Sequence, residues 1–164
     1  MAEQGRKEEG IAQMREGLAA LQAPTPRPQY LCLLAKACIE TGRLDDAMSA
    51  LTEAEAAADE DENSNYEPEA RRLKGDLLLA QNNSNTEEAQ HCFERAIEIA
   101  QNQSAKSWEL RATMSLARLL ASQGRREEAR RMVADIYGWF TEGFDTADLK
   151  DAKALLDELS TREA

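Results

Sequence analysis

Few residues of this chain have the type and spacing that chemistry requires, and the acidic run at residues 59–64 is the most suggestive. Its sequence, DEDENS, begins like a calcium-binding loop of the EF-hand type. That loop needs glycine at its sixth position for a sharp turn and glutamate at its twelfth as a bidentate ligand. Ser64 and Ala70 occupy those positions here. The run therefore indicates a solvated acidic connector, and we expect no metal site.

The single histidine, His91, is followed directly by Cys92. Adjacent residues of a helix point about 100° apart, so these two side chains cannot hold one ion. Cys92 also lies on an apolar stripe, which favours a core cysteine beside a surface histidine over a catalytic pair. With Cys32 and Cys38 the cysteine count is odd and contains no C-x-x-C spacing. We expect three reduced core thiols in a cytosolic protein.

Enzyme, nucleic-acid and membrane functions are all disfavoured by the sequence. It contains no phosphate-binding glycine loop, dinucleotide fingerprint or zinc-protease helix, so we expect neither catalysis nor a cofactor. A net charge of −11 disfavours binding to nucleic acid, whose phosphates require a basic surface. The first ten residues are too polar for a signal peptide, and no run of about 18 apolar residues occurs. We therefore expect a cytoplasmic protein.

One group of residues does indicate binding. When helical hairpins are stacked in register, the exposed concave side of their first helices carries four cations: Lys36, Arg72, Arg111 and Arg118. In so acidic a chain, this cluster could receive a carboxylate, a phosphate or an acidic segment of a partner protein. Carboxylates share the same wall, and in the alternative interpretation they pair with these cations internally: Glu40, Glu69 and Asp76.

The hairpins are indicated by an internal repeat. One frame of small and apolar residues, anchored on Ala47, Ala89 and Ala129, recurs at intervals of about 40 residues. The abundance of Ala, Leu, Glu, Arg and Gln favours helix nearly everywhere. We therefore predict one all-α domain over residues 1–164, a right-handed superhelix of antiparallel helical hairpins with a C-terminal capping helix.

The units of this superhelix follow from the frame and from its breaks. We predict a half unit at 6–22 and hairpins at 29–60, 67–102 and 107–140. The half unit is in the register of a second helix and has no first helix, and three prolines end it: Pro24, Pro26 and Pro28. Burial of its apolar face on a second copy would give a homodimer through residues 6–22.

The helix starts carry capping signals. Residues 141–143 break the pattern, and the capping helix is expected at 146–160. Asp145 and Asp148 have capping-box spacing, with Phe144 and Leu149 at the flanking hydrophobic-staple positions. Asn85, with Glu88 three residues later, is the expected N-cap of an earlier helix.

The repeating frame resembles the tetratricopeptide repeat. The matching positions are a small residue, a bulky one and a second small one in the second helices, with a glycine in one first helix: Ala47, Ala89, Ala129, Leu51, Phe93, Val133, Ala54, Ala96 and Gly75. The resemblance implies a helical scaffold for protein–protein interaction.

A narrower resemblance rests on residues 9–21, 72–78 and 109–119, and most specifically on the run YGWFTEGFDTADL at 137–149. These segments are similar to the C-terminal repeat region of large bacterial signalling proteins. Those proteins combine a class III adenylate/guanylate cyclase domain, or a DNA-binding domain, with a P-loop ATPase of the AAA/STAND type. The resemblance implies a sensor or regulatory arm, and it transfers no activity, because neither cyclase nor nucleotide-binding residues lie in this chain.

We therefore expect a non-catalytic interaction module with a protein or peptide partner of acidic character. The alternative is a structural unit for homo-oligomerisation that has no separate ligand.

Overall fold

The computed structural model describes the chain apart from residues 1, 21–26, 61–64, 83 and 162–164. The described part is helical and contains no strand. Its helices, in chain order, are α1 (Ala2–Ala20), α2 (Arg27–Glu40), α3 (Leu44–Glu60), α4 (Glu67–Gln81), α5 (Thr86–Asn102), α6 (Lys106–Ser122), α7 (Arg126–Tyr137) and α8 (Ala147–Ser160).

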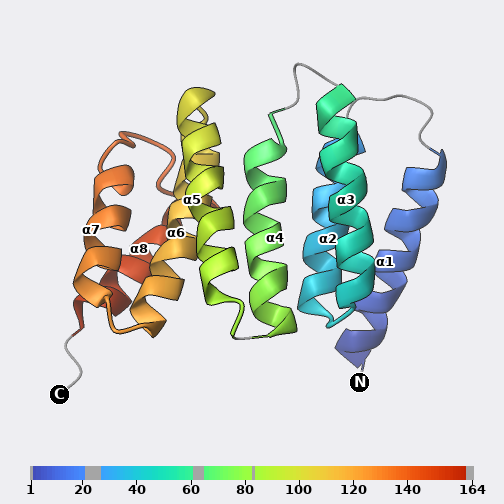
Figure 1. Ribbon diagram of the computed structural model, residues 1–164, viewed down its shortest axis with the longest axis horizontal. Helices are drawn as coiled ribbons and strands as arrows, with labels where there is room; N and C mark the ends of the chain where they lie inside the picture. Colours follow the sequence, from blue (N-terminus) through green and yellow to red (C-terminus); the bar gives the residue numbers. More distant parts are fainter. Residues whose placement is uncertain (1, 21–26, 61–64, 83, 162–164) are drawn as a thin grey trace.

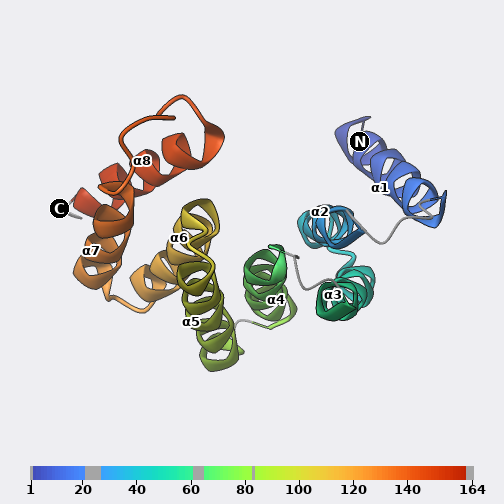
Figure 2. The same ribbon diagram turned by 90° about the horizontal axis from the view of Figure 1, so that it is seen from above.

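Successive helices lie side by side and alternate in direction, as Figure 1 shows. The closest packing is within the pairs α2–α3, α4–α5 and α6–α7, which are the three hairpins. The row curves when it is seen from above, and α1 and α8 stand at its two ends (Figure 2). This arrangement confirms the expected all-α repeat fold. The helices begin and end within four residues of the expected units.

Tight turns join the first and second helices of two hairpins. Gly42 and Gly124 have φ values of 75° and 84°, a left-handed conformation that glycine adopts without steric cost. The amide of the next residue then donates back into the helix, from Arg43 to Cys38 O at 2.8 Å and from Arg125 to Leu120 O at 2.9 Å. These contacts satisfy carbonyls that the helix ends would leave unpaired.

Contrary to the expectation from the sequence, Pro28 does not end the preceding helix. It is buried in the first turn of α2, where a missing amide hydrogen costs nothing because no intrahelical acceptor is available there. Pro24 and Pro26 lie outside the described residues.

The repeat frame forms the core. Ala47, Ala89 and Ala129 are completely buried, which lets paired helices approach closely. Phe93 of α5 is also completely buried, and it packs on Gly75 of α4. A Cβ atom at residue 75 would lie 2.8 Å from Cδ1 of the phenyl ring and closer still to Cε1. Glycine is therefore required at residue 75, because the ring of Phe93 lies too close to the α4 backbone there for any side chain.

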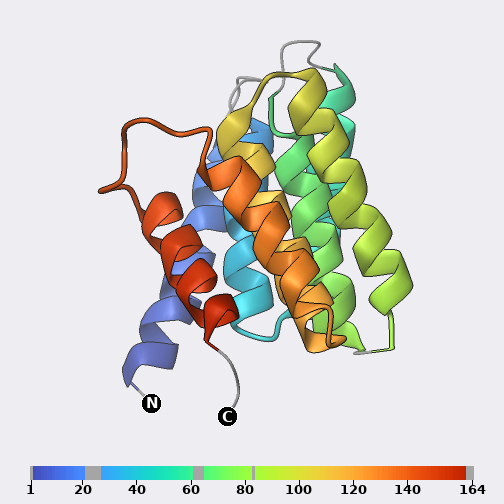
Figure 3. The same cartoon turned by 90° about the vertical axis from the view of Figure 1, so that its left-hand side faces the viewer.

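The capping helix predicted at the C-terminal end is present. α8 packs against α6 and α7, and it buries its apolar face: Leu149, Ala152, Leu155 and Leu159. Figure 3 shows α8, in red, beside the orange α7 at this end of the row. The opposite face of α8 is polar and exposed, with Lys150, Lys153 and Asp157. α8 thus covers the last hairpin and presents a polar surface.

Two capping predictions at helix starts are wrong, and the last hairpin is slightly shorter than expected. This hairpin, expected at about 107–140, ends at Tyr137 of α7, so Phe140 lies outside the helix. Asn85 precedes α5 but does not cap it; its Nδ2 donates instead to Leu78 O at 3.2 Å. Asp145 and Asp148 form no capping box, since α8 begins after Thr146 and Asp148 is bound elsewhere.

The expected hydrophobic staple at the start of α8 is also absent. Leu149 is buried, whereas Phe144 is exposed and its ring lies 5.7 Å from that of Tyr137. Thr146 organises this turn by donating its hydroxyl to Gly143 O at 2.7 Å.

Candidate functional site: a polar hollow along the first helices

The four cations singled out in the sequence line one hollow of about 350 Å³. Its walls come from α2, α4, α6 and the first turn of α8. A neighbouring hollow of about 640 Å³ shares Arg72, Asp76, Ser115 and Arg118 with it and extends along α4 and α6. We call the first of these the inner hollow. The hairpin stacking predicted from the sequence thus brings Lys36, Arg72, Arg111 and Arg118 together.

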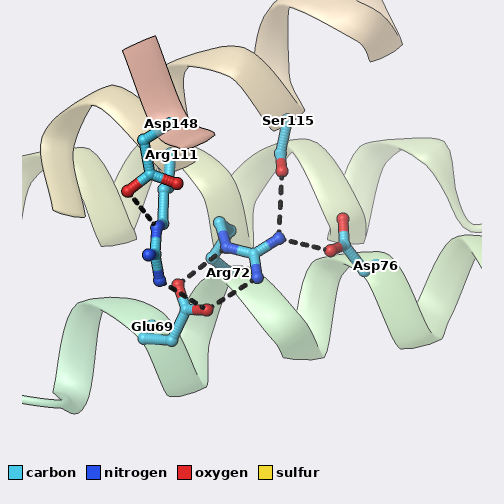
Figure 4. Close-up of polar contacts among 6 residues, drawn as sticks. All are labelled: Glu69, Arg72, Asp76, Arg111, Ser115 and Asp148. Carbon is cyan, nitrogen blue, oxygen red and sulfur yellow. Dashed lines mark hydrogen bonds and ion pairs between the residues drawn. The ribbon is translucent and has the colours of Figure 1, made fainter. Parts of the chain in front are cut away.

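Arg72 lies at the centre of a buried polar network (Figure 4). Its Nε and Nη2 atoms each donate to the carboxylate of Glu69 at 2.8 Å, a bidentate pair on consecutive turns of α4. Its Nη1 atom donates to Asp76 at 2.5 Å and to the hydroxyl of Ser115, on α6, at 3.3 Å. The side chains of Arg72 and Glu69 are only 12% and 8% exposed, so little solvent screens them.

Arg111 joins α6 to two other helices. Its Nε donates to Asp148 of α8 at 2.8 Å, and its Nη1 lies 3.7 Å from Glu69 of α4. Its guanidinium carbon also lies 4.8 Å from the ring centre of Trp108, a cation–π distance. Figure 4 shows Arg72 and Arg111 converging on the same Glu69 carboxylate. Glu69 is therefore shared by two cations.

The electrostatics of this network keep its charges paired. Burial alone would lower the pKa of Arg72, but hydrogen bonds and charge from Glu69 and Asp76 outweigh it and raise that pKa. Burial also raises the pKa of Asp76, while the positive charges of Arg72 and Arg118 act in the opposite direction. Arg72 is consequently a permanent cation whose charge is already neutralised within the fold.

Of the four candidate cations, Arg72 and Arg111 are paired within the fold. Their partners include two of the three carboxylates considered in the alternative interpretation, Glu69 and Asp76. Lys36 and Arg118 are exposed and form no ion pair among the described residues. The hollow is not basic overall, because five carboxylates line it with the four cations: Glu40, Glu69, Asp76, Asp148 and Asp151.

Sequence reasoning missed Asp148, Ser115 and Trp108. Asp148 was assigned to a cap, although it follows Arg111 by about one repeat length. Residues one repeat apart occupy equivalent turns of stacked first helices, and α8 stands in a first-helix position. That spacing is the signal that could have identified the pair.

The other candidate groups are one histidine and three thiols. His91 is exposed, and Cys32 and Cys38 are buried free thiols. Cys92 is only half-buried, which corrects its expected core position. Burial raises the pKa of Cys32 to about 12 and also raises the pKa values of the other two thiols. A protonated thiol is a poor nucleophile.

The described residues contain no group of His, Cys, Asp or Glu side chains arranged to hold a metal ion. Most of the acidic run at 59–64, namely residues 61–64, lies outside them. No helix in the described ranges is both long enough and apolar enough to cross a membrane.

Two segments of the chain match the tetratricopeptide repeat family, residues 28–61 and 73–103. They correspond to the hairpin α2–α3 and to most of α4–α5. These two segments are therefore similar to tetratricopeptide repeats. The repeat is a non-catalytic protein-interaction module, in agreement with the expectation that this chain is not an enzyme.

The fold is similar to solved tetratricopeptide-like structures. Two crystal structures of nearly identical TPR-like repeats, assigned to a kinesin light chain of Podosopora anserina, superpose with TM-scores of 0.58 and 0.57. Each is 19% identical in sequence and covers 94% of this chain, with 77% and 78% of the other chain covered. At this identity the similarity shows the fold. No curated protein matches the sequence significantly.

Proposed function

We propose that this chain is a protein-interaction module whose inner hollow receives an extended segment of a partner protein. The observation that supports it most is the position of Lys36 and Arg118. Both are exposed cations at the edge of one hollow whose other charges are largely paired. A partner segment that places carboxylates against these two groups would gain charge-assisted hydrogen bonds.

The same hollow restricts how acidic this partner can be. Glu40 and Asp151 also line it and form no ion pair among the described residues. A uniformly acidic segment would meet repulsion from them. The best partner therefore carries a few carboxylates at defined positions, with neutral or basic residues between them.

This proposal is tested by measuring the binding of the protein to an array of peptides that differ in the number and position of their Asp and Glu residues. Peptides with spaced carboxylates should bind, and added salt should weaken binding, because exposed charges are screened over about 8–10 Å at physiological ionic strength. Lys36→Glu combined with Arg118→Glu should abolish binding. The control is Arg131→Glu, a charge reversal on α7 whose side chain is 72% exposed. Equal peptide binding by both variants would refute this use of the hollow.

We further propose that the module is the C-terminal sensor or regulatory arm of a bacterial signalling protein with a cyclase or ATPase domain. The support is the sequence resemblance, above all in residues 137–149. An antibody against the module tests it in cells of the source organism. The protein detected should be far larger than 18.2 kDa and should contain one of those domains. A full-length product without either domain would refute this context.

The second candidate is a structural unit that only oligomerises. A specific observation favours it: an apolar groove on α1 and α2 that no other part of the described chain covers. Self-association without any peptide binding would favour this candidate over the first.

A further inference from the structure

α1 occupies the position of a second helix whose first helix is absent from the described residues. Its Gly10, Gln13, Met14 and Gly17 precede a buried set of α3 residues by one repeat of about 37 residues. That set is Ala47, Ala50, Leu51 and Ala54. The α3 residues are at most 4% exposed in the hairpin with α2, whereas Met14 is 41% exposed.

This uncovered face forms one wall of an apolar groove of about 590 Å³ between α1 and α2. Among the described residues, five large hydrophobic side chains are exposed, and three of them line this groove: Met14, Tyr30 and Leu33. Concentration of exposed apolar surface in one place is typical of an interface. The groove therefore lies where the hairpin pattern places a first helix.

The two ends of the row differ in this respect. At the other end, α8 covers the last hairpin and turns Lys150, Lys153 and Asp157 outward. Such a polar face would not pack well in an apolar groove, because its charged side chains would lose their contact with water. End-to-end stacking of copies through α8 is therefore disfavoured. An occupant must instead present an apolar helix face.

α1 itself presents such a face. In the α4–α5 hairpin, the bulky Phe93 packs on the glycine of the facing helix, Gly75. α1 carries a bulky residue and small residues on one face, Met14 with Gly10 and Gly17, so two α1 helices can make a contact of the same kind. Among the described residues, no atom apart from the adjoining backbone of α1 lies within 4 Å of a Cβ built on either glycine, so packing within the described part of one copy requires neither.

We propose that a second copy of this chain covers the groove, with the two α1 helices packed antiparallel about a two-fold axis. A two-fold axis across α1 produces the antiparallel direction that every hairpin of the fold has. It also places Met14 of each copy over a glycine of the other, in a self-complementary interface. α1 carries four acidic and three basic residues, so its charge is nearly balanced although the chain has a net charge of −11.

Sedimentation of the full chain over a concentration series tests the proposal. The sedimenting mass should approach that of a dimer as concentration rises. Met14→Glu should weaken the dimer about tenfold or more, because it buries a charge in the interface. Trp139→Glu is the matched control; this side chain is 58% exposed and lies outside the groove, so the variant should dimerise like the wild type.

Gly10→Ala decides the outcome if Met14→Glu fails to fold. Within one copy the added methyl group meets nothing, and alanine favours helix over glycine, so helix content and melting of the monomer should not fall. The dimer should weaken nevertheless. A wild-type chain that stays monomeric, or variants at Met14 and Gly10 that dimerise normally, would overturn the proposal.

The two-fold arrangement has its own test. Gln13→Cys places a thiol on the same wall, near the middle of the paired helices, and should form a disulfide between identical residues of two copies. A dimer that forms no such link would overturn the arrangement. This inference rests on the second candidate function, self-association through this groove, and is independent of the inner hollow: Lys36→Glu with Arg118→Glu should leave dimerisation unchanged, so the peptide-binding proposal and the dimer can each fail without the other.

Discussion

At the scale of single residues, Arg72 shows why a charged side chain on an inner wall need not be available to a partner. Two carboxylates and a hydroxyl satisfy its guanidinium, and the group is largely buried. Arg118 lines the same hollow but is exposed and has no ion-pair partner in the described chain. The two arginines should therefore differ sharply in what they contribute to stability and to binding.

Arg72→Met should lower the free energy of unfolding by about 3 kcal/mol, since it leaves the buried Glu69 with only the more distant Arg111. Arg118→Met should change it by less than about 0.5 kcal/mol, because the side chain is exposed and unpaired. Urea unfolding of both variants measures the difference. Equal effects on stability would contradict the network described for Arg72.

Gly75 is a second residue whose role is specific. Gly75→Ala should destabilise the protein by about 1–3 kcal/mol, because the new methyl group overlaps the ring of Phe93. The smaller side chain of Phe93→Leu removes this overlap. Gly75→Ala should therefore cost less stability in the Phe93→Leu background than in the wild type. Thermal unfolding of the three variants gives the coupling. Additive effects would contradict direct contact between these positions.

At the scale of elements, α1 is attached less extensively than the other helices. It packs on α2 through Ile11 and Leu18, and an ion pair of 2.5 Å links its Arg15 to Asp46 of α3. The hydrogen bond from Arg15 is the largest influence that lowers the pKa of Asp46 below its ordinary value of 3.8. The charged form of Asp46 is thus favoured in the folded state.

This shift gives attachment of α1 a defined pH dependence. A carboxyl whose pKa is lower when folded contributes stability that is present above its unfolded pKa and lost as pH falls through the folded value. α1 should therefore loosen below about pH 4. Protection of its amides from hydrogen exchange, corrected for intrinsic pH effects, measures this. In the Asp46→Asn variant, the amides of α1 should be weakly protected already at neutral pH. Acid should cause little further loss of protection, because the ion pair with Arg15 is already absent.

At the scale of the whole molecule, the buried side chains form two clusters. One extends from α1 to α4 and includes Leu51, and the other extends from α4 to α8 and includes Val133. In a solenoid each unit contacts only its neighbours, so α4 transmits stability between the two clusters. The single domain predicted from the sequence requires this coupling to be strong.

Leu51→Ala tests the single domain. The cavity should cost about 2–5 kcal/mol. Both tryptophans, Trp108 and Trp139, lie in the C-terminal half, so their fluorescence reports that half while circular dichroism reports all helices. In one cooperative domain, Leu51→Ala shifts both unfolding curves equally. A shift of the dichroism curve alone would show that the two clusters unfold separately.

The sequence by itself determined the helices, their pairing into hairpins and the polar capping helix. Ala47, Ala89 and Ala129 were identified by spacing alone, and all are completely buried. These features are readable because each helix must bury one face, and that requirement leaves a regular pattern in the residues of the helix itself. The positions of the four cations on one wall follow from the same register.

Only the tertiary structure decided which of those cations is free. Arg111 meets Asp148 because α8 is stacked on α6, and Glu69 serves two arginines because α4 and α6 approach closely at that turn. The capping role predicted for Asp148 was wrong for the same reason. Its carboxylate accepts a hydrogen bond from Arg111 on another helix, which a local sequence pattern does not reveal. Ion pairs depend on the offset and rotation between helices, to within an ångström or so. A repeat pattern specifies neighbours, but it does not specify those distances.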